Sequence, residues 1–290
     1  MARNPGGAVQ PPPIVLGGST VDTVMVERWS DGIAEIGSDV AAAEVPVSLE
    51  YNGISHAVML ASPADLEDFA TGFSLTEGIV DHPRDILDLE VIERDEGLQV
   101  RITIAAGRFH RLKSRRRSMA GRTGCGLCGT ESLAQVFRPI APVTAQGTVE
   151  PLALQRTLEE LAGAQTLQRL TGATHAAAWL AGDGGLAAIR EDVGRHNALD
   201  KLIGGLALSG TDFSAGAVVI TSRASSEMVQ KAAAVGIGIL AAISAPTGLA
   251  IRMAEQLNLT LVGFARRDRH VLYAGPHRIA GHTTRQGDHQ

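Results

Sequence analysis

The chain has 290 residues, of which 44% are hydrophobic and only 3% aromatic. This composition excludes wholesale disorder and predicts a core built from Ala, Val, Leu and Ile. The net charge of −5 gives no global attraction to nucleic acid or to an anionic membrane, so neither is an expected partner. The longest apolar run, residues 232–245, is short for a membrane span. The first 20 residues do not resemble an export signal, and we expect them to form a disordered tail. We therefore expect a cytoplasmic protein.

The first half of the chain is predicted to mix β-hairpins with one helix. Strands are expected at residues 21–29, 44–51 and 54–60, and a further hairpin at 89–105. Asn52-Gly53 separates two of these strands and is a strong hairpin signal. Ser62 is expected to cap the following helix, with Pro63 at its first position. These elements predict a smaller N-terminal hairpin and helix domain over residues 21–145, after a tail at 1–20.

The second half, after a proline-rich boundary at residues 139–151, has a different order of predicted elements, in which strands alternate with helices. Helices are expected at 152–170, 192–206 with Asp192 as cap, 226–235 and 247–257, and strands at 176–181, 186–190, 216–221, 237–243, 259–264 and 271–273. The strands are continuously apolar, which indicates burial on both faces. Their alternation with helices indicates right-handed parallel crossovers. The sequence therefore predicts an α/β domain over residues 146–290, in a chain that is α+β overall.

Three of these strands end in polar loops. In open α/β sheets, ligands bind beyond the carboxyl ends of the strands. The loops at 222–226 and 244–247 lead into helix N-termini, whose free N–H groups bind anions. The loop at 265–269 supplies three arginines, which suit phosphates. The pattern predicts a phosphorylated or nucleotide-like ligand, and the alternative is a set of ordinary surface loops with helix caps.

Two cysteines lie in a glycine-rich loop, Thr123-Gly124-Cys125-Gly126-Leu127-Cys128-Gly129, directly after a basic run. Nearby cations and a following helix N-terminus would lower a thiol pKa and favour the reactive thiolate. Three chemistries fit the spacing: a structural zinc site, a dithiol–disulfide couple and a persulfide carrier. Zinc would need two more ligands, and the thioredoxin-like context of a redox pair is absent. The motif alone leaves all three open.

Two histidines also stand out. His196 and Asp200 share a face of the expected helix at a spacing of four residues, which predicts a hydrogen-bonded structural pair. His175 could be a zinc ligand of a deaminase-type site. Such a site has a catalytic Glu shortly after the His. Ala176 and Ala177 stand there instead, which argues against deaminase chemistry.

Five blocks of the sequence together resemble the formate dehydrogenase accessory sulfurtransferase (FdhD) family. They follow the family's order and span most of the chain beyond the tail: 123–129, 191–204, 221–232, 244–250 and 261–266. The resemblance implies a cytidine-deaminase-like, three-layer C-terminal domain with a mixed sheet, and it implies a homodimer.

The resemblance also implies a function as a sulfurtransferase. The chain would accept sulfur from a cysteine desulfurase, hold it as a persulfide on Cys125, and pass it to the molybdenum bis(molybdopterin guanine dinucleotide) cofactor that is inserted into formate dehydrogenase. Cys128 would support this by steadying the thiolate or by releasing the sulfur through a disulfide. The cofactor-binding stretch matches Phe264, Ala265, Arg266, Arg267, Asp268 and Arg269. A departure is Arg267-Asp268-Arg269, where the family leads us to expect small residues. The alternative function is a non-catalytic cofactor chaperone that docks partners through the cysteine loop.

Overall fold

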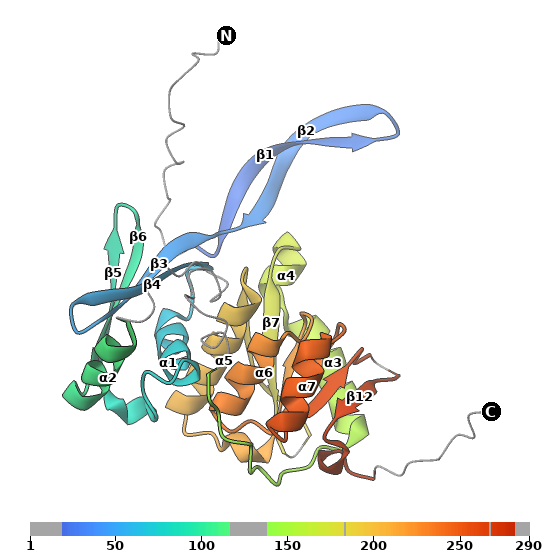
Figure 1. Cartoon of the computed structure of the whole chain (residues 1–290). Helices are drawn as coiled ribbons and strands as arrows, with labels where there is room; N and C mark the ends of the chain where they lie inside the picture. The colour runs from blue at the N-terminus through green and yellow to red at the C-terminus, as the bar shows by residue number, and fades with distance from the viewer. Residues whose placement is uncertain (1–18, 117–137, 183, 267, 282–290) are drawn as a thin grey trace.

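The computed structural model describes residues 19–116, 138–182, 184–266 and 268–281. Within them lie a two-stranded sheet, a four-stranded sheet and a six-stranded sheet, with helices packed between and around the larger two (Figure 1). The mixed α/β fold class predicted from the sequence is confirmed. Among the described residues, no helix is long and apolar enough to cross a membrane.

The first part of the chain forms two separate sheets built from hairpins, and in the larger one the two hairpins meet through a parallel pair of strands. β1 (Val21–Ser30) and β2 (Ile33–Ala42) make the two-stranded sheet. The four-stranded sheet has the order β4-β3-β6-β5, from strands β3 (Val45–Tyr51), β4 (Ile54–Ala61), β5 (Ile86–Arg94) and β6 (Gly97–Ile104). Asn52 and Gly53 have φ values of 46° and 81°, so the predicted hairpin is confirmed. The strand β2 was not predicted.

The six-stranded sheet forms the middle layer of the second part, in the order β12-β11-β10-β9-β7-β8. The strands are β7 (His175–Leu180), β8 (Leu186–Asp192), β9 (Ala217–Ile220), β10 (Ile239–Ala242), β11 (Thr260–Gly263) and β12 (Val271–Ala274). β9, β10 and β11 are parallel, as predicted, and the flanking pairs are antiparallel. All residues of β9, β10 and β11 are buried, because both faces of the sheet are covered.

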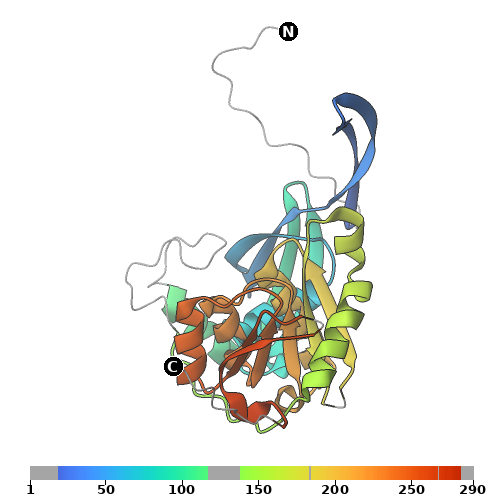
Figure 2. The ribbon, with the colours of Figure 1, turned by 90° about the vertical axis from the view of Figure 1, so that its right-hand side faces the viewer.

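Helices cover the two faces of this sheet unequally (Figure 2). α3 (Pro151–Ala164) packs on one face and contributes Leu154, Leu158 and Leu161 to that core. The other face is covered by α5 (Arg195–Leu208), α6 (Ser226–Ala234) and α7 (Gly248–Gln256). The predicted single helix at 152–170 is wrong, because Gln165 interrupts it and α4 (Thr166–Thr171) follows.

The two parts of the chain meet where α1 (Leu66–Thr76) packs against α5. The helices approach so closely that a Cβ on Gly72 would collide with the backbone carbonyl of Asp200, and one on Gly204 with that of Asp68. Glycine is therefore required at both positions for steric reasons. The division into domains at residues 145 and 146 stays a prediction.

The start of α1 differs from the prediction. Asp65, not Ser62, occupies the N-cap position. Ser62 is fully buried, and its backbone N–H and carbonyl bond Asp192 and Lys201 of the second part. Its polar groups are used in this long-range contact, so the helix begins one turn later.

Candidate functional site

The carboxyl ends of β8, β9, β10 and β11 lie along one edge of the six-stranded sheet, and α5, α6 and α7 begin there. Backbone contacts join the neighbouring loops. Thr247 N donates to Ala224 O at 3.0 Å, and Phe264 N donates to Ser244 O at 3.2 Å. Three helix N-termini and four strand ends therefore form one continuous edge, which we call the carboxyl edge.

The predicted cofactor-binding stretch begins at the end of β11. Phe264 has a φ of 46° and its side chain is 42% exposed. Ala265 is buried and donates its N–H to Ala242 O at 3.0 Å, which anchors the turn to β10. Arg266 N donates to Arg269 O at 2.7 Å and closes a tight loop. The side chains of Arg266, Asp268 and Arg269 are exposed, and Arg267 lies outside the described residues.

Two of the three helix N-termini on this edge lack side-chain caps. Thr247 caps α7 by accepting from Ala250 N at 3.2 Å. α5 and α6 have Gly194 and Ser225 at their N-cap positions, without a side-chain cap bond. Ser225 Oγ is buried and has no hydrogen-bond partner in the described chain. The first turns of α5 and α6 therefore present positive helix ends.

A charged cluster lies between these two helix starts. His196 Nε2 lies 2.6 Å from Glu227 Oε2, and both side chains are mostly buried. Burial alone would raise the pKa of Glu227, but the nearby His196 and Arg195 outweigh it and hold that pKa below its ordinary value. Burial, reinforced by the charge of Arg195, lowers the pKa of the neighbouring His175. The Arg195 Nε is buried and, among the described residues, has no hydrogen-bond partner.

The predicted pair of His196 with Asp200 is wrong. His196 pairs with Glu227, and Asp200 pairs with Lys231 at 2.8 Å. Both of these α5 residues therefore have their partners on α6. Asp200 also accepts from Thr76 at the end of α1. Sequence reasoning missed Glu227 and Lys231, although their spacing of four residues on a predicted helix was a usable signal.

Asp192 has a different role from the predicted helix cap. Its Oδ1 accepts from Gly194 N at 2.7 Å and from Asn197 Nδ2 at 2.9 Å. Its Oδ2 accepts from Ser62 N at 3.0 Å and lies 2.7 Å from Lys201 Nζ. This buried carboxylate therefore fixes the turn that starts α5 without itself occupying the N-cap position.

The two cysteines of the sequence motif, Cys125 and Cys128, lie outside the described residues. The described chain before them ends with α2 (Ala106–Arg116), whose Arg108 forms ion pairs with Asp81 and Asp85. In the described residues, no group of three or more potential metal ligands occurs.

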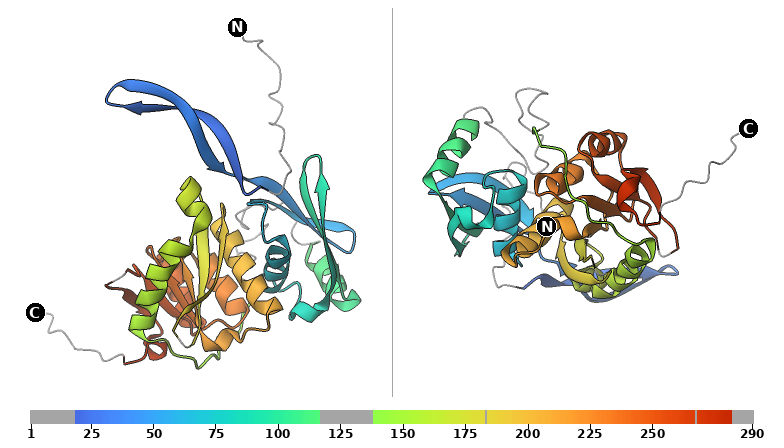
Figure 3. Two further views of the ribbon diagram at one scale, coloured as in Figure 1. Left: turned by 180° about the vertical axis from the view of Figure 1, so that it is seen from behind. Right: turned by 90° about the horizontal axis from the view of Figure 1, so that it is seen from below.

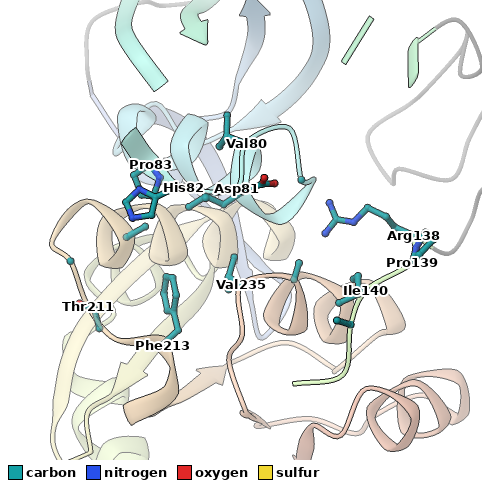
Figure 4. Close-up of a pocket in the computed structure, with 16 residues that line it drawn as sticks. Val80, Asp81, His82, Pro83, Arg138, Pro139, Ile140, Thr211, Phe213 and Val235 are labelled. Carbon is teal, nitrogen blue, oxygen red and sulfur yellow. The ribbon is translucent and has the colours of Figure 1, made fainter. Parts of the chain in front are cut away.

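A cleft of about 600 Å³ lies at the opposite end of α5 and α6 from the carboxyl edge. Figure 4 shows Asp81 and His82 on one side of it and Phe213 and Val235 on the other. Arg138, the first described residue after the cysteine segment, also lines this cleft. The cleft and the carboxyl edge are thus two separate features, which lie at opposite ends of α5 and α6.

Fold and edge together define a mixed α/β protein in which helix starts without side-chain caps meet the strand ends at one edge of the sheet. The model of the FdhD/NarQ family matches residues 42–280, and the chain belongs to this family. Two relatives are each called "Sulfur carrier protein FdhD". The one from Cupriavidus necator is 57% identical over 260 residues, which cover 90% of each chain. The one from Bordetella petrii is 54% identical over 242 residues, 83% of this chain and 87% of the relative.

A solved structure supports the fold. It is a putative formate dehydrogenase accessory protein from Desulfotalea psychrophila, with a TM-score of 0.73 and 23% sequence identity. The match covers 90% of this chain and all of the other. At this identity the likeness carries the fold alone.

Proposed function

We propose that this protein is a sulfurtransferase that serves the maturation of formate dehydrogenase. It takes sulfur from a cysteine desulfurase, carries it as a persulfide on Cys125, and delivers it to the molybdenum bis(molybdopterin guanine dinucleotide) cofactor as substrate. The observation that carries the proposal is the carboxyl edge, where uncapped helix starts and exposed arginines suit a large phosphorylated acceptor. The names of the relatives, sulfur carrier protein FdhD, support the sulfur step.

The sulfur step needs one nucleophilic thiolate. The Cys125 thiolate attacks the terminal sulfur of the donor persulfide, a new S–S bond forms, and the donor cysteine leaves as a thiolate. The acceptor then takes that terminal sulfur. If the Cys128 thiolate attacks Cys125, a disulfide forms and hydrosulfide leaves with the bonding electrons, and a dithiol reductant must then restore both thiols. If Cys128 only steadies the thiolate, the acceptor attacks the terminal sulfur with its own electron pair, the S–S bond breaks and Cys125 leaves as a thiolate, so no external reductant is needed.

The acceptor end of the proposal uses the loop after β11. Phe264 offers an exposed ring for stacking on a guanine base, held in place by the anchored Ala265. Arg266, Arg267 and Arg269 supply guanidinium groups for the phosphates, and Asp268 supplies a carboxylate that accepts from guanine N–H groups. The protein acts in the cytoplasm as a homodimer, and formate dehydrogenase receives the cofactor.

Mass spectrometry of the intact protein tests the sulfur step. After incubation with a cysteine desulfurase and cysteine, we expect a gain of one sulfur, about 32 Da, located on Cys125 by peptide mapping. A Cys125→Ser variant should lose the adduct, and a Cys128→Ser variant should keep it. The absence of an adduct on either cysteine would overturn the proposal. A Cys125→Ala variant that fully supports formate dehydrogenase activity in cells would favour the non-catalytic chaperone.

A further inference from the structure

The hairpin of β1 and β2 forms an arm that projects from the rest of the molecule in the side views (Figures 1 and 2, and Figure 3, left). The strands pair over their full length, from Val21 opposite Ala42 to Ser30 opposite Ile33. Asp31 and Gly32 both have positive φ values, 52° and 81°, as in the tight turns that match strand twist. The arm is thus a regular hairpin that stands largely outside the molecular body.

The two faces of the arm differ in chemistry. Residues directly opposite each other in an antiparallel pair share a face. One face carries Met25, Trp29 and Ile36, which are 71%, 69% and 81% exposed. The other face carries charge, because Arg28 lies opposite Glu35 and forms an ion pair with Asp39 at 3.3 Å. The arm therefore has one apolar face, on which Glu27 is the single charged residue.

An apolar face on a thin hairpin is unfavourable in water. Isolated two-stranded hairpins are at best marginally stable, and soluble monomers rarely expose contiguous apolar patches of this kind. The edges of the arm are also unpaired in the described sheet, which leaves backbone groups open to further pairing. The arm has the properties of a surface that another protein covers.

The same chain carries a second uncovered apolar surface. β4 is an edge strand of the four-stranded sheet, and its Val58 and Leu60 are 59% and 55% exposed. These residues lie opposite Ser48 and Pro46, on the face away from the buried Val47. Two apolar surfaces on one chain can cover each other reciprocally when two copies meet about a twofold axis.

We infer that the arm is the dimerisation element: the Met25–Trp29–Ile36 face of one copy packs on the Val58–Leu60 surface of β4 in the second copy, and the reverse. This names the interface of the homodimer proposed above and rests on that proposal. At about 3.3 Å per residue and 4.8 Å per strand, the arm face measures about 33 Å by 10 Å. Two reciprocal contacts would then bury about 1,300 Å² in total, within the range of stable interfaces.

Sedimentation velocity over a dilution series tests the inference with four variants. Trp29→Glu and Ile36→Glu place a charge in the apolar face, and Val58→Glu places one in the receiving surface. Each should weaken the dimer by at least about 30-fold, as expected for a central interface residue. Ile33→Glu is the matched control: Ile33 is 66% exposed on the same arm but lies on the charged face, so this variant should dimerise like the wild type.

Tryptophan fluorescence gives a second readout. The chain has two tryptophans, and Trp179 is buried with 3% exposure, so acrylamide quenching reports mainly on Trp29. Quenching of the wild type should fall as the protein is concentrated, and quenching of Val58→Glu should stay high.

The outcomes separate this inference from the proposals on which it rests. A wild type that stays monomeric throughout would overturn the homodimer and the arm interface together. A wild-type dimer that the Trp29 and Ile36 variants leave intact would overturn the arm alone. A dimer that Val58→Glu leaves intact would overturn β4 as the receiving surface. Circular dichroism spectra and thermal unfolding of all four variants should match the wild type, which shows that they are folded, and persulfide formation on Cys125 should be unchanged.

Discussion

The ammonium group of Lys201 lies 2.7 Å from the carboxylate of Asp192, and both side chains are completely buried. Lys201 also donates to Ser62 O at 2.9 Å. This pair joins the start of α5 to the segment that precedes α1, so it connects elements from the two halves of the sequence. A buried ion pair of this kind gives orientation, and its partners depend on each other.

Removing one partner should therefore be costly. Asp192→Asn leaves the Lys201 charge buried without its counter-ion, and we expect a loss of about 3–5 kcal/mol in the free energy of unfolding. Urea denaturation followed by circular dichroism measures this value. Asp88→Asn, at an exposed position on β5, should change it by less than about 0.5 kcal/mol. Equal stabilities of the two variants would contradict the role assigned to Asp192.

The contact between α1 and α5 should be intolerant of added volume. Gly72→Ala places a methyl group against the Asp200 carbonyl, and overpacking of this kind costs about 1–3 kcal/mol or more. Gly107→Ala is the control, because Gly107 lies in α2 with open space at its Cβ and alanine there should stabilise by about 0.5–1 kcal/mol. Thermal unfolding should shift in opposite directions for the two variants. A Gly72→Ala protein as stable as the wild type would refute the close packing.

Glu227 should contribute to stability in a pH-dependent way. Its pKa is lowered in the folded protein, so the folded state favours the ionised form, and the contribution is present above the unfolded pKa of about 4.3. It is lost as the pH falls through the lower, folded value. The difference in unfolding free energy between the wild type and Glu227→Gln should thus be largest near neutral pH and shrink in acid. A difference that is constant across this range would show that the His196 pair does not perturb Glu227.

Nucleotide binding should depend on the loop after β11. Arg266→Gln removes one exposed guanidinium at the carboxyl edge, and we expect about 10-fold or greater weakening of guanosine diphosphate binding, as for one charge-assisted hydrogen bond. Isothermal titration calorimetry measures the affinity. Arg156→Gln, which removes an exposed arginine from α3 on the other face of the sheet, should bind like the wild type. Equal weakening by both variants would indicate attraction by net charge alone.

Local signals in the sequence predicted much of the fold. The apolar runs of β9, β10 and β11 indicated a buried parallel sheet, and Asn52-Gly53 indicated a hairpin, because each pattern is decided by neighbouring residues. The role of Ser62 could not be found in this way, since its partner Asp192 is 130 residues away.

The candidate site was predicted only in part. The strand-end loops lie on one edge, as expected for parallel strands, but their binding role and that of the cysteines stay predictions. The pairing of His196 and Asp200 failed because a shared helix face brings residues near each other without excluding better partners. Glu227 and Lys231 on α6 are those partners, and the packing of α6 against α5 brings them to His196 and Asp200.

His196, Asp200, Glu227 and Lys231 form two pairs, one helical turn apart, between α5 and α6. α5 offers His196 and then Asp200, and α6 offers Glu227 and then Lys231. A slide of α6 by one turn, about 5.4 Å, would bring Glu227 against Asp200 in one direction and Lys231 against His196 in the other. The first slip places two carboxylates against each other, and either slip separates Asp200 from its buried counter-ion Lys231, so movement in both directions is opposed. The two uncapped helix starts at the carboxyl edge must then move as one rigid piece, with their spacing set before any acceptor arrives.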